Sequence, residues 1–316
     1  MKNGITRLAP SPTGALHLGN ARTFVLNALL ARSQNWRMLF RMEDLDGPRV
    51  KAGSDKLAFD DLNWLGLNWE TPVVYQSQRT QFYLDALDEL KKSGLVYPCI
   101  CSRKDIMLAA SAPHADDNLR TYPGTCRGRF DSAQQATEQS GRAVAWRLAV
   151  DDAVVEFDDK IAGHQKFNLR ETCGDFIIFR NEGIASYQLA VTVDDSAAGV
   201  NQIVRGDDLL ESAARQIYLR QILGLSDDVT YWHLPLVKGV DGLRLAKRHG
   251  DTRVASYRAQ GTTPQQILGL IAFWSGQIPT LAEIDFAELV RIFDPDKIPH
   301  QPVVFTKEHD NFLLRK

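Results

Sequence analysis

Residues Pro10 to Asn20 read PSPTGALHLGN, and they join an apolar run that begins near Ile5 to an amphipathic pattern that begins near Gly19. A strand, a glycine-bearing loop and a helix start in that order are typical of a nucleotide-binding turn. Because Gly14 and Gly19 carry no Cβ, the backbone at both positions can approach a triphosphate closely. The glycine spacing fits neither a Walker A motif nor a G-x-G-x-x-G fingerprint, so we expect a phosphate site of another type.

His17 lies at the start of the expected helix. Its imidazole can donate a hydrogen bond to a phosphate oxygen, and a donor placed against the charge that develops at the α-phosphate stabilises an in-line displacement. A single His-x-Gly is a weak signal, because an ordinary turn can contain the same residues. The interpretation of His17 as a donor to a phosphate therefore depends on motifs further along the chain.

The composition is that of an ordinary globular chain. With 316 residues, 44% of them hydrophobic, the sequence can bury a sizeable core and predicts about two domains. No apolar run approaches the roughly 20 residues of a membrane span, and the N-terminus lacks the pattern of a secretory signal. We therefore expect a cytoplasmic enzyme. Because the net charge is −2, any contact with RNA must come from a local basic patch.

Apolar periodicity predicts that strands and helices alternate in the first part of the chain. The predicted elements are a strand near Ile5, a helix over 21–32, a strand over 37–42, and helices over 54–65, capped by Ser54, and over 78–92. A strand, a helix and a second strand form a βαβ unit, so the sequence predicts an α/β fold on a parallel sheet. Glu43 follows the second strand, at the sheet edge where such folds place ligands. Its carboxylate suits a cationic amine, although an acidic turn in solvent has the same composition.

Three of the four cysteines lie close together in the sequence. Cys99 and Cys101 form a C-x-C pair, and Cys126 follows a loop rich in Ala, Pro and Asp. Zinc takes four ligands in tetrahedral geometry, and these thiolates supply three of them. His114 would be the fourth on ligand chemistry alone. Reduced cysteines without a metal remain the alternative, because C-x-C with a long separation is a looser signature than paired C-x2-C.

The second part of the chain mixes strands and helices. Strands are predicted over 143–150, 154–157, 176–179, 186–193 and 231–237, and helices over 209–223, 253–259, 264–274 and 281–293. Pro264 lies at a helix start, the position that proline favours.

The opening stretch, extended back to Arg7, resembles the HIGH region of class I glutamyl-tRNA synthetases, whose pattern is R-x-A-P-S-P-T-G-x-x-H-x-G. The resemblance implies that Arg7, Ala9 and Ser11 line a glutamate pocket. It also implies that His17 is the first His of the motif. Asn20 stands where that motif has its second His, so the role of the second His is not carried over.

Three later segments resemble the same family. RMEDLD looks like its R-x-E-D-T-D segment, in which the Glu, here Glu43, binds the ammonium group of the substrate. YQLAVTVDD looks like its Y-x-L/F-A-x-V-V-D-D segment, which would make Tyr187 a glutamate contact. RGDDL matches R-G-x-D-L, and Arg205 offers a planar fork for a carboxylate. Without the resemblance, an Arg at the end of a strand is as often a surface ion-pair partner as a residue that binds a ligand.

The loop GLRLAKRHG resembles the KMSKS loop, which the glutamyl branch writes K-L-S-K-R. Lys247 takes the position of the second Lys, the cation expected on the ATP phosphates, while Arg244 replaces the first Lys and Ala246 the Ser. The resemblance therefore implies that His17 and Lys247 are catalytic. The implied ATP-binding set is Pro10, Gly14, His17, Gly19 and Lys247.

The resemblance also bears on the metal. Tyr122, in a Tyr-x3-Cys arrangement, matches what the family shows at that place. It implies one structural Zn²⁺ per chain, held by Cys99, Cys101, Tyr122 and Cys126. With Tyr122 as the fourth ligand, His114 is not expected to bind the zinc ion.

The implied fold is α/β, a Rossmann-like class I synthetase core over 1–97 and 186–250, with a zinc-bearing α+β insert over 98–185 and a helical stem-contact region over 251–316. The implied activity is activation of L-glutamate with Mg²⁺-bound ATP as glutamyl-adenylate, followed by transfer to RNA. Ordinary members continue into a large anticodon-binding region. The shortness of this sequence favours the branch that places glutamate on the queuosine base of tRNA(Asp), acting as a monomer.

Two alternatives stay open. A short glutamyl-tRNA synthetase that charges tRNA(Glu) would have the same motifs. A synthetase-like RNA-binding module without catalysis would tolerate the departures at Asn20, Arg244 and Ala246, but the intact His17 and Lys247 argue against it.

Overall fold

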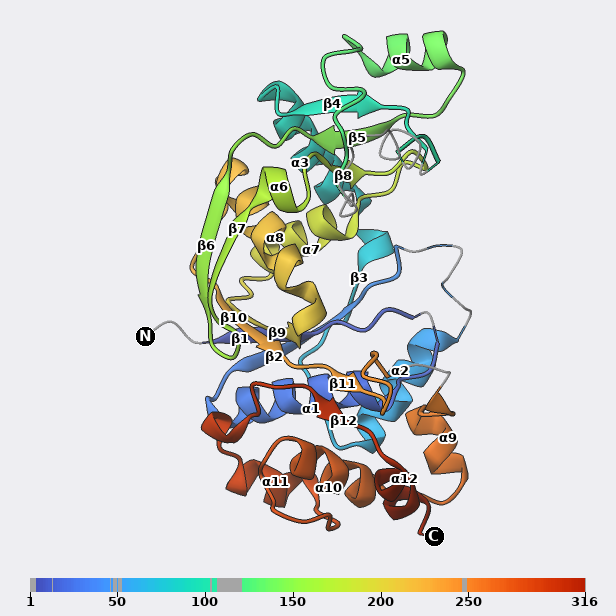
Figure 1. Ribbon diagram of the computed structural model, residues 1–316, viewed down its shortest axis with the longest axis vertical. Helices are drawn as coiled ribbons and strands as arrows, with labels where there is room; N and C mark the ends of the chain where they lie inside the picture. Colours follow the sequence, from blue (N-terminus) through green and yellow to red (C-terminus); the bar gives the residue numbers. More distant parts are fainter. Residues whose placement is uncertain are drawn as a thin grey trace.

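The computed structural model describes residues 4–12, 14–45, 47, 50, 53–102, 104–106, 121–245 and 249–315. His114, Ala246 and Lys247, named above, lie outside these ranges. Figure 1 shows an elongated molecule with a parallel sheet across its middle, a smaller antiparallel sheet at one end and a layer of helices at the other.

The parallel sheet consists of two halves that meet in the middle of the molecule (Figure 1). One half has the order β1 (Ile5–Leu8), β2 (Arg37–Met42), β3 (Val74–Tyr75), and the other has β9 (Gln202–Gly206), β10 (Thr230–Leu234), β6 (Val154–Asp159), all paired in parallel. The halves join where the backbone N–H of Asn201 donates to the carbonyl of Ile5 at 3.0 Å. The chain therefore runs outward in opposite directions from β1 and β9, which is the switch point where open α/β sheets bind ligands.

The predicted βαβ unit is confirmed. The helix α1 (Leu18–Ser33) links β1 to β2 and begins three residues earlier than the periodicity indicated. It is buried around most of its circumference, because the sheet covers one side and C-terminal helices cover the other. Those helices are α10 (Pro264–Trp274), α11 (Phe286–Ile292) and α12 (Lys307–Leu314), and they share one hydrophobic core with α1, β1 and β2.

The helices α2 (Ser54–Trp64) and α3 (Thr80–Lys92) match their predictions to within two residues, and η2 (Gln76–Gln78) precedes α3. The prediction that Ser54 caps α2 is wrong. Gly53 is the N-cap residue, with φ 78°, and Ser54 is buried inside the first turn. A left-handed residue here favours glycine, which has no Cβ to clash.

The end of the molecule drawn uppermost in Figure 1 is an antiparallel sheet of β4 (Val96–Cys99), β5 (Ala145–Leu148) and β8 (Phe176–Phe179), with α5 (Ala133–Ser140) beside it. From there the hairpin of β6 and β7 (Gly163–Asn168) runs toward the parallel sheet, where β6 pairs with β10. The short α6 (Leu169–Thr172) follows this hairpin.

The strand predicted over 186–193 is wrong, since this segment begins the helix α7 (Tyr187–Ala197). Ser186 caps it by accepting from the backbone N–H of Leu189. The apolar run misled the prediction because α7 is covered on several sides, so that consecutive residues are buried and no helical face stands out. The helix α8 (Leu210–Ile222), preceded by η3 (Asp207–Leu209), matches its prediction and packs on α7.

The strand predicted over 231–237 is divided into β10 and β11 (Val237–Lys238), because Pro235 between them has no N–H for a ladder. The strand β11 pairs with β12 (Val303–Val304), which no pattern indicated. The helices α9 (Val254–Ala259) and α10 are confirmed, and α10 has Pro264 in its first turn. The helix predicted over 281–293 begins only at Phe286, after its cap Asp285, and η5 (Pro295–Lys297) follows it. Within the described ranges, no helix combines the length and apolar character that crossing a membrane requires.

Candidate active site

A cavity of about 440 Å³ lies at the carboxyl ends of β1, β2, β9 and β10, at the switch point of the sheet. Every residue of the predicted glutamate set lines it, namely Arg7, Ala9, Ser11, Glu43, Tyr187 and Arg205. Of the predicted ATP set, Pro10, His17 and Gly19 line the same cavity and Gly14 does not. Lys247 lies outside the described residues. The sheet therefore gathers segments that are far apart in the sequence, while the role of each residue stays a prediction.

His17 is the N-cap residue of α1, so the loop and helix meet where the sequence predicted. Its Nδ1 lies 3.3 Å from Oγ1 of Thr252. The neighbouring backbone is tied to the same segment, since Leu18 N–H donates to the Thr252 carbonyl at 3.0 Å and Val254 N–H donates to the Leu16 carbonyl at 2.8 Å. A helix N-terminus attracts phosphate through its free N–H groups and its dipole. The start of α1 thus gives this end of the cavity a preference for anions.

A buried ion-pair network lies behind one side of the cavity and reaches its lining through Arg7 and Glu43. The Nε of Arg7 on β1 donates to Oδ1 of Asp195 on α7 at 3.1 Å, and Nη1 of Arg41 on β2 donates to the same carboxylate. Arg41 also donates from Nη2 to Oε1 of Glu43 at 2.9 Å. Burial alone would raise the pKa of Asp195, but the guanidinium groups of Arg41 and Arg7 outweigh burial and hold that pKa at about 2. Asp195 is therefore a permanent anion that fixes both arginines.

Glu43 is the acidic member of the network that faces the cavity. Burial raises the pKa of its carboxyl group, and the positive charge of Arg41 only partly opposes that rise. An ammonium group that binds this carboxylate would reduce the free-energy cost of its burial, because a second cation, in addition to Arg41, would neutralise the buried negative charge.

Arg205 has two of its three nitrogens engaged. Its Nε donates to Nε2 of His233 at 3.0 Å, and its Nη1 donates to Oε1 of Gln216 at 2.8 Å. Its Nη2 is buried and has no hydrogen-bond partner among the described residues. A buried donor without a partner costs free energy unless a ligand accepts from it. Arg205 is thus equipped to bind an anion in the cavity.

The charges that line the cavity are complementary to one kind of small molecule. Arg7 and Arg205 bring two guanidinium groups to the lining and Glu43 brings one carboxylate, while Arg244 and Asp208 pair with each other within the lining. The partners of Arg7 and Glu43, which are Asp195 and Arg41, are not among the lining residues. An amino acid with a carboxylate side chain carries two negative groups and one positive group. The described part of the cavity therefore has the charge pattern of a site for an acidic amino acid.

Four residues that hold this site together could not be recognised from the sequence. Arg41 and Asp195 were visible only as identities within family-like segments, and no role was attached to them. His233 and Gln216, which fix Arg205, belong to no motif. A lone His or Gln in an apolar stretch gives no signal of its own, because its function depends on a partner elsewhere in the chain.

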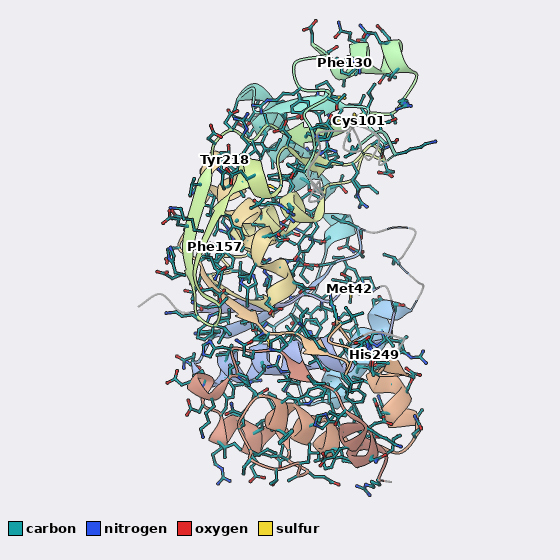
Figure 2. All side chains as sticks on the ribbon, in the orientation of Figure 1. Met42, Cys101, Phe130, Phe157, Tyr218 and His249 are labelled. Atoms are coloured by element: carbon teal, nitrogen blue, oxygen red, sulfur yellow. The ribbon has the colours of Figure 1, made fainter. Side chains whose placement is uncertain are left out.

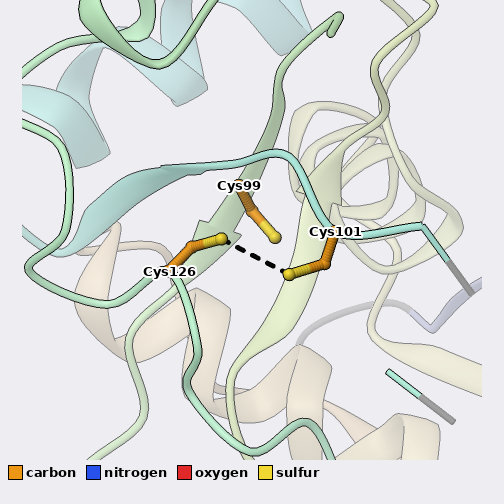
Figure 3. Close-up of side chains that lie close together, drawn as sticks. All are labelled: Cys99, Cys101 and Cys126. Atoms are coloured by element: carbon orange, nitrogen blue, oxygen red, sulfur yellow. Dashed lines mark hydrogen bonds between the residues drawn. The ribbon is translucent and has the colours of Figure 1, made fainter. Parts of the chain in front are cut away.

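The three clustered cysteines are brought together as predicted (Figure 3). The Sγ atoms of Cys99, Cys101 and Cys126 all lie within 4.8 Å of one another. The hydroxyl oxygen of Tyr122 is 3.5 Å from Sγ of Cys99 and 3.4 Å from Sγ of Cys101. Burial raises the pKa of the Cys101 thiol to about 12, and a bound zinc ion would supply the charge that lets a thiol ionise. Three soft donors and a fourth oxygen at one point fit a tetrahedral zinc site.

The cysteine cluster is remote from the cavity. Figure 2 shows Cys101 and Phe130 near the upper end of the molecule, whereas Met42, which precedes Glu43, lies in the middle. The backbone beside the cluster is tightly packed, because a Cβ added to Gly174 would lie 2.6 Å from the side chain of Thr121. The cluster thus has the surroundings of a structural site.

A family model described as tRNA synthetases class I (E and Q), catalytic domain, matches residues 5–309. A protein from Symbiobacterium thermophilum named Glutamyl-Q tRNA(Asp) synthetase is 44% identical to this chain, and the match covers 94% of each. A protein of the same name from Nocardia farcinica is 43% identical over 99% of this chain and 95% of its own length. A protein from Halorhodospira halophila named Glutamate--tRNA ligase 1 is 36% identical over 96% of this chain and 65% of its own length.

Among solved structures, the crystal structure of a glutamate tRNA ligase from Elizabethkingia meningosepticum superposes with a TM-score of 0.83. The match covers 99% of this chain and 69% of that one, at 23% sequence identity. The two proteins therefore share a fold.

Proposed function

Because this chain belongs to the class I tRNA synthetases of the E and Q type, we propose that it activates L-glutamate with Mg²⁺-bound ATP and transfers the glutamate to the queuosine base of tRNA(Asp). The α/β class I synthetase fold expected from the sequence is confirmed. The observation that carries the proposal for glutamate is the convergence of Arg7, Arg205 and Glu43 on one cavity.

Glu43, Arg205 and Arg7 each have a place in glutamate recognition. Glu43 accepts from the substrate ammonium group, since a carboxylate in a buried setting favours a cation. Arg205 offers its free Nη2 to a carboxylate. Arg7, whose Nε is held by Asp195 and whose Nη1 donates to the Val204 carbonyl at 3.5 Å, offers Nη2 to a second one. Glutamine or alanine would leave buried donors unpaired, so the site discriminates by the cost of unmade hydrogen bonds.

The phosphates of ATP are expected at the start of α1. In the activation step, an oxygen of the glutamate α-carboxylate attacks the α-phosphorus, a new P–O bond forms, and pyrophosphate leaves. His17 lies where an imidazole donor can stabilise the charge on the transferring phosphate. Lys247 is proposed for the same task from its sequence position alone.

Support for the queuosine acceptor comes from the relatives, since the two more similar of the three named above are called Glutamyl-Q tRNA(Asp) synthetase. A hydroxyl of the cyclopentene diol would attack the acyl carbon of glutamyl-adenylate, so that an ester forms and AMP leaves. The product is an ester, and it should be lost in mild base.

The test is direct. The enzyme is incubated with labelled glutamate, ATP and Mg²⁺, and with tRNA(Asp) that carries or lacks queuosine, or with tRNA(Glu). We expect label only on queuosine-containing tRNA(Asp), and we expect its isolated anticodon stem-loop to be labelled as well. Pyrophosphate exchange with glutamate should proceed without any RNA, because every proposed glutamate and ATP contact belongs to this chain.

A second candidate function is charging of tRNA(Glu) at its 3′ end, favoured by the similarity to a protein named Glutamate--tRNA ligase 1. Charging of tRNA(Glu) with efficiency comparable to that for queuosine-containing tRNA(Asp) would select this candidate instead.

Glutamate use should depend on pH through Glu43. Because burial raises the pKa of this carboxyl group above its ordinary value of 4.5, the free enzyme gains a proton there at a higher pH than an exposed Glu would. The protonated group cannot pair with an ammonium, so kcat/KM for glutamate should fall as pH drops through the raised pKa. Pyrophosphate exchange measured across the pH range checks this. In the Glu43→Gln variant, kcat/KM for glutamate should no longer fall in this pH range. A fall that persists in the variant would show that another group titrates.

We also propose that Cys99, Cys101, Tyr122 and Cys126 hold one structural zinc ion per chain. Cys101→Ser should lose the metal and lower the thermal stability of the surrounding sheet, since zinc binding contributes directly to folding. Glutamate activation should persist in the folded fraction, because the cluster is remote from the cavity. Elemental analysis and thermal unfolding measure both effects. Cys173→Ser, in a different hydrophobic cluster, is the control that should keep its zinc. A parent enzyme that is fully active without stoichiometric zinc would contradict the proposal.

A further inference from the structure

Arg205 is the first member of a row of buried polar side chains that leads away from the cavity. It lies opposite His233 in the parallel ladder of β9 and β10, and its Nε donates to the imidazole Nε2. On the other side of the ring, Nδ1 of His233 lies 2.6 Å from Oδ2 of Asp159, the last residue of β6. The exposed fraction is 5% for Arg205, 0% for His233 and 4% for Asp159, so water does not compete within the row.

The outer members of this row determine the protonation of the middle one. A guanidinium can only donate hydrogen bonds, and an ionised carboxylate can only accept them. His233 must therefore carry its proton on Nδ1, facing Asp159, and present the lone pair of Nε2 to Arg205. Asp159 is fixed in turn, because Oδ1 accepts from the backbone N–H groups of Ile161 at 2.9 Å and Ala162 at 2.8 Å. The imidazole is thus held in one tautomer and one orientation.

The opposite edge of the guanidinium is held as well. Nη1 of Arg205 donates to Gln216, whose Nε2 donates to Oε1 of Gln188 at 3.1 Å. With Nε and Nη1 engaged, Nη2 is the nitrogen left for a ligand. The direction in which Nη2 points therefore depends on the imidazole behind it.

We infer that Asp159 and His233 are positioning residues for amino-acid selection, which hold the Arg205 guanidinium so that Nη2 meets a carboxylate of the substrate. The inference rests on the proposed function, because it takes Arg205 to be a glutamate contact. Neither residue lines the cavity, so both act through Arg205. Asp159 comes from the β6–β7 hairpin, which joins the antiparallel sheet to the parallel one. The hairpin thus takes part in substrate selection as well as in the framework.

Asp159→Asn tests the row with little change of shape. Its amide oxygen can still accept from the backbone, but its N–H would face His233 and move the imidazole proton to Nε2, against the Arg205 N–H. We expect KM for glutamate in pyrophosphate exchange to rise about 10- to 100-fold, the range found when carboxylates that orient metal-bound histidines are removed. The KM for ATP should not change. Nitrogen NMR of the imidazole without substrate should show a protonated Nδ1 in the parent and a protonated Nε2 in the variant.

Two further variants separate positioning from packing. His233→Gln places an amide oxygen near the position of Nε2 and should keep most of the affinity for glutamate. His233→Asn reaches only as far as Nδ1 and should raise KM as Asp159→Asn does. The matched control is Asp158→Asn, the same substitution one position earlier, where the side chain is 87% exposed. This control should match the parent.

The outcomes distinguish the inference from the function beneath it. Unchanged KM for glutamate in Asp159→Asn and His233→Asn, in an enzyme that Arg205→Ala disables, would overturn the positioning role and leave the proposed function standing. Unchanged glutamate kinetics in Arg205→Ala itself would remove the substrate contact and the inference with it. Equal losses in His233→Gln and His233→Asn, with KM for ATP raised as well, would mark a role in packing alone. If the variants do not fold, a protonated Nε2 in the parent overturns the inference by itself.

Discussion

Alanine in place of Asp195 is expected to lower the free energy of unfolding by about 3 to 5 kcal/mol, the cost of breaking a buried ion pair by removing one partner. The carboxylate is 1% exposed and accepts from both Arg7 and Arg41, so its loss leaves the buried Arg7 without its anion and takes one carboxylate partner from the buried Arg41. The same change should abolish glutamate activation, because both arginines lose the contact that orients them. Urea unfolding and pyrophosphate exchange measure the two effects.

The control for this change is Asp88→Ala, which removes an exposed carboxylate paired with Lys91. Exposed pairs contribute about 0 to 1 kcal/mol, so its stability should stay close to that of the parent. A loss of similar size in both variants would contradict the claim that burial makes Asp195 important. Asp195→Asn, which keeps the shape and removes the charge, decides the matter if the alanine variant does not fold.

The stability that Asp195 provides should also depend on pH. Its pKa in the folded protein, about 2, is below the ordinary value of 3.8, so the contribution is fully present above about pH 4. It is lost as pH falls from 3.8 toward 2, because the unfolded chain then takes up the proton more readily. Acid unfolding of the parent should therefore include a component in this window that Asp195→Asn lacks.

Arg205→Ala is expected to lower kcat/KM for glutamate by about 1000-fold, which corresponds to the roughly 4 kcal/mol lost when one partner of a buried, hydrogen-bonded charge pair is removed. The KM for ATP should not change, since the loss concerns the amino acid. Arg205→Lys should not restore activity, because one ammonium cannot replace a planar fork that contacts His233, Gln216 and a carboxylate together.

The comparison for Arg205 is Arg170→Ala, at an arginine that is 63% exposed and paired with Asp152 on the surface. We expect parent kinetics there. If the Arg205→Ala enzyme still prefers glutamate to glutamine by the same ratio as the parent, recognition of the substrate carboxylate must be assigned to Arg7 alone.

The sequence allowed the βαβ unit and the helix after the glycine-bearing loop to be predicted, because both depend on local periodicity. Contiguous motifs named the six residues of the predicted glutamate set, and all six line the cavity. The helix α7 was mistaken for a strand because neighbouring elements bury its residues on several sides, which erases the helical period. The supports of the site could not be predicted for another reason. Arg7 and Asp195 are 188 residues apart, and His233 and Asp159 are 74 apart, so only tertiary structure relates them.

The pairing of Arg7 with Asp195 also determines when the catalytic core can finish folding during synthesis on the ribosome. Arg7 leaves the ribosome early, but the carboxylate that neutralises it is translated 188 residues later. At a rate of about 5 to 20 residues per second, the nascent chain carries an unmatched arginine on its first strand for roughly 10 to 40 seconds. The N-terminal half cannot complete its native interior in that interval. Final consolidation of the catalytic core must therefore wait until α7 has emerged, so the two halves of the sheet mature together.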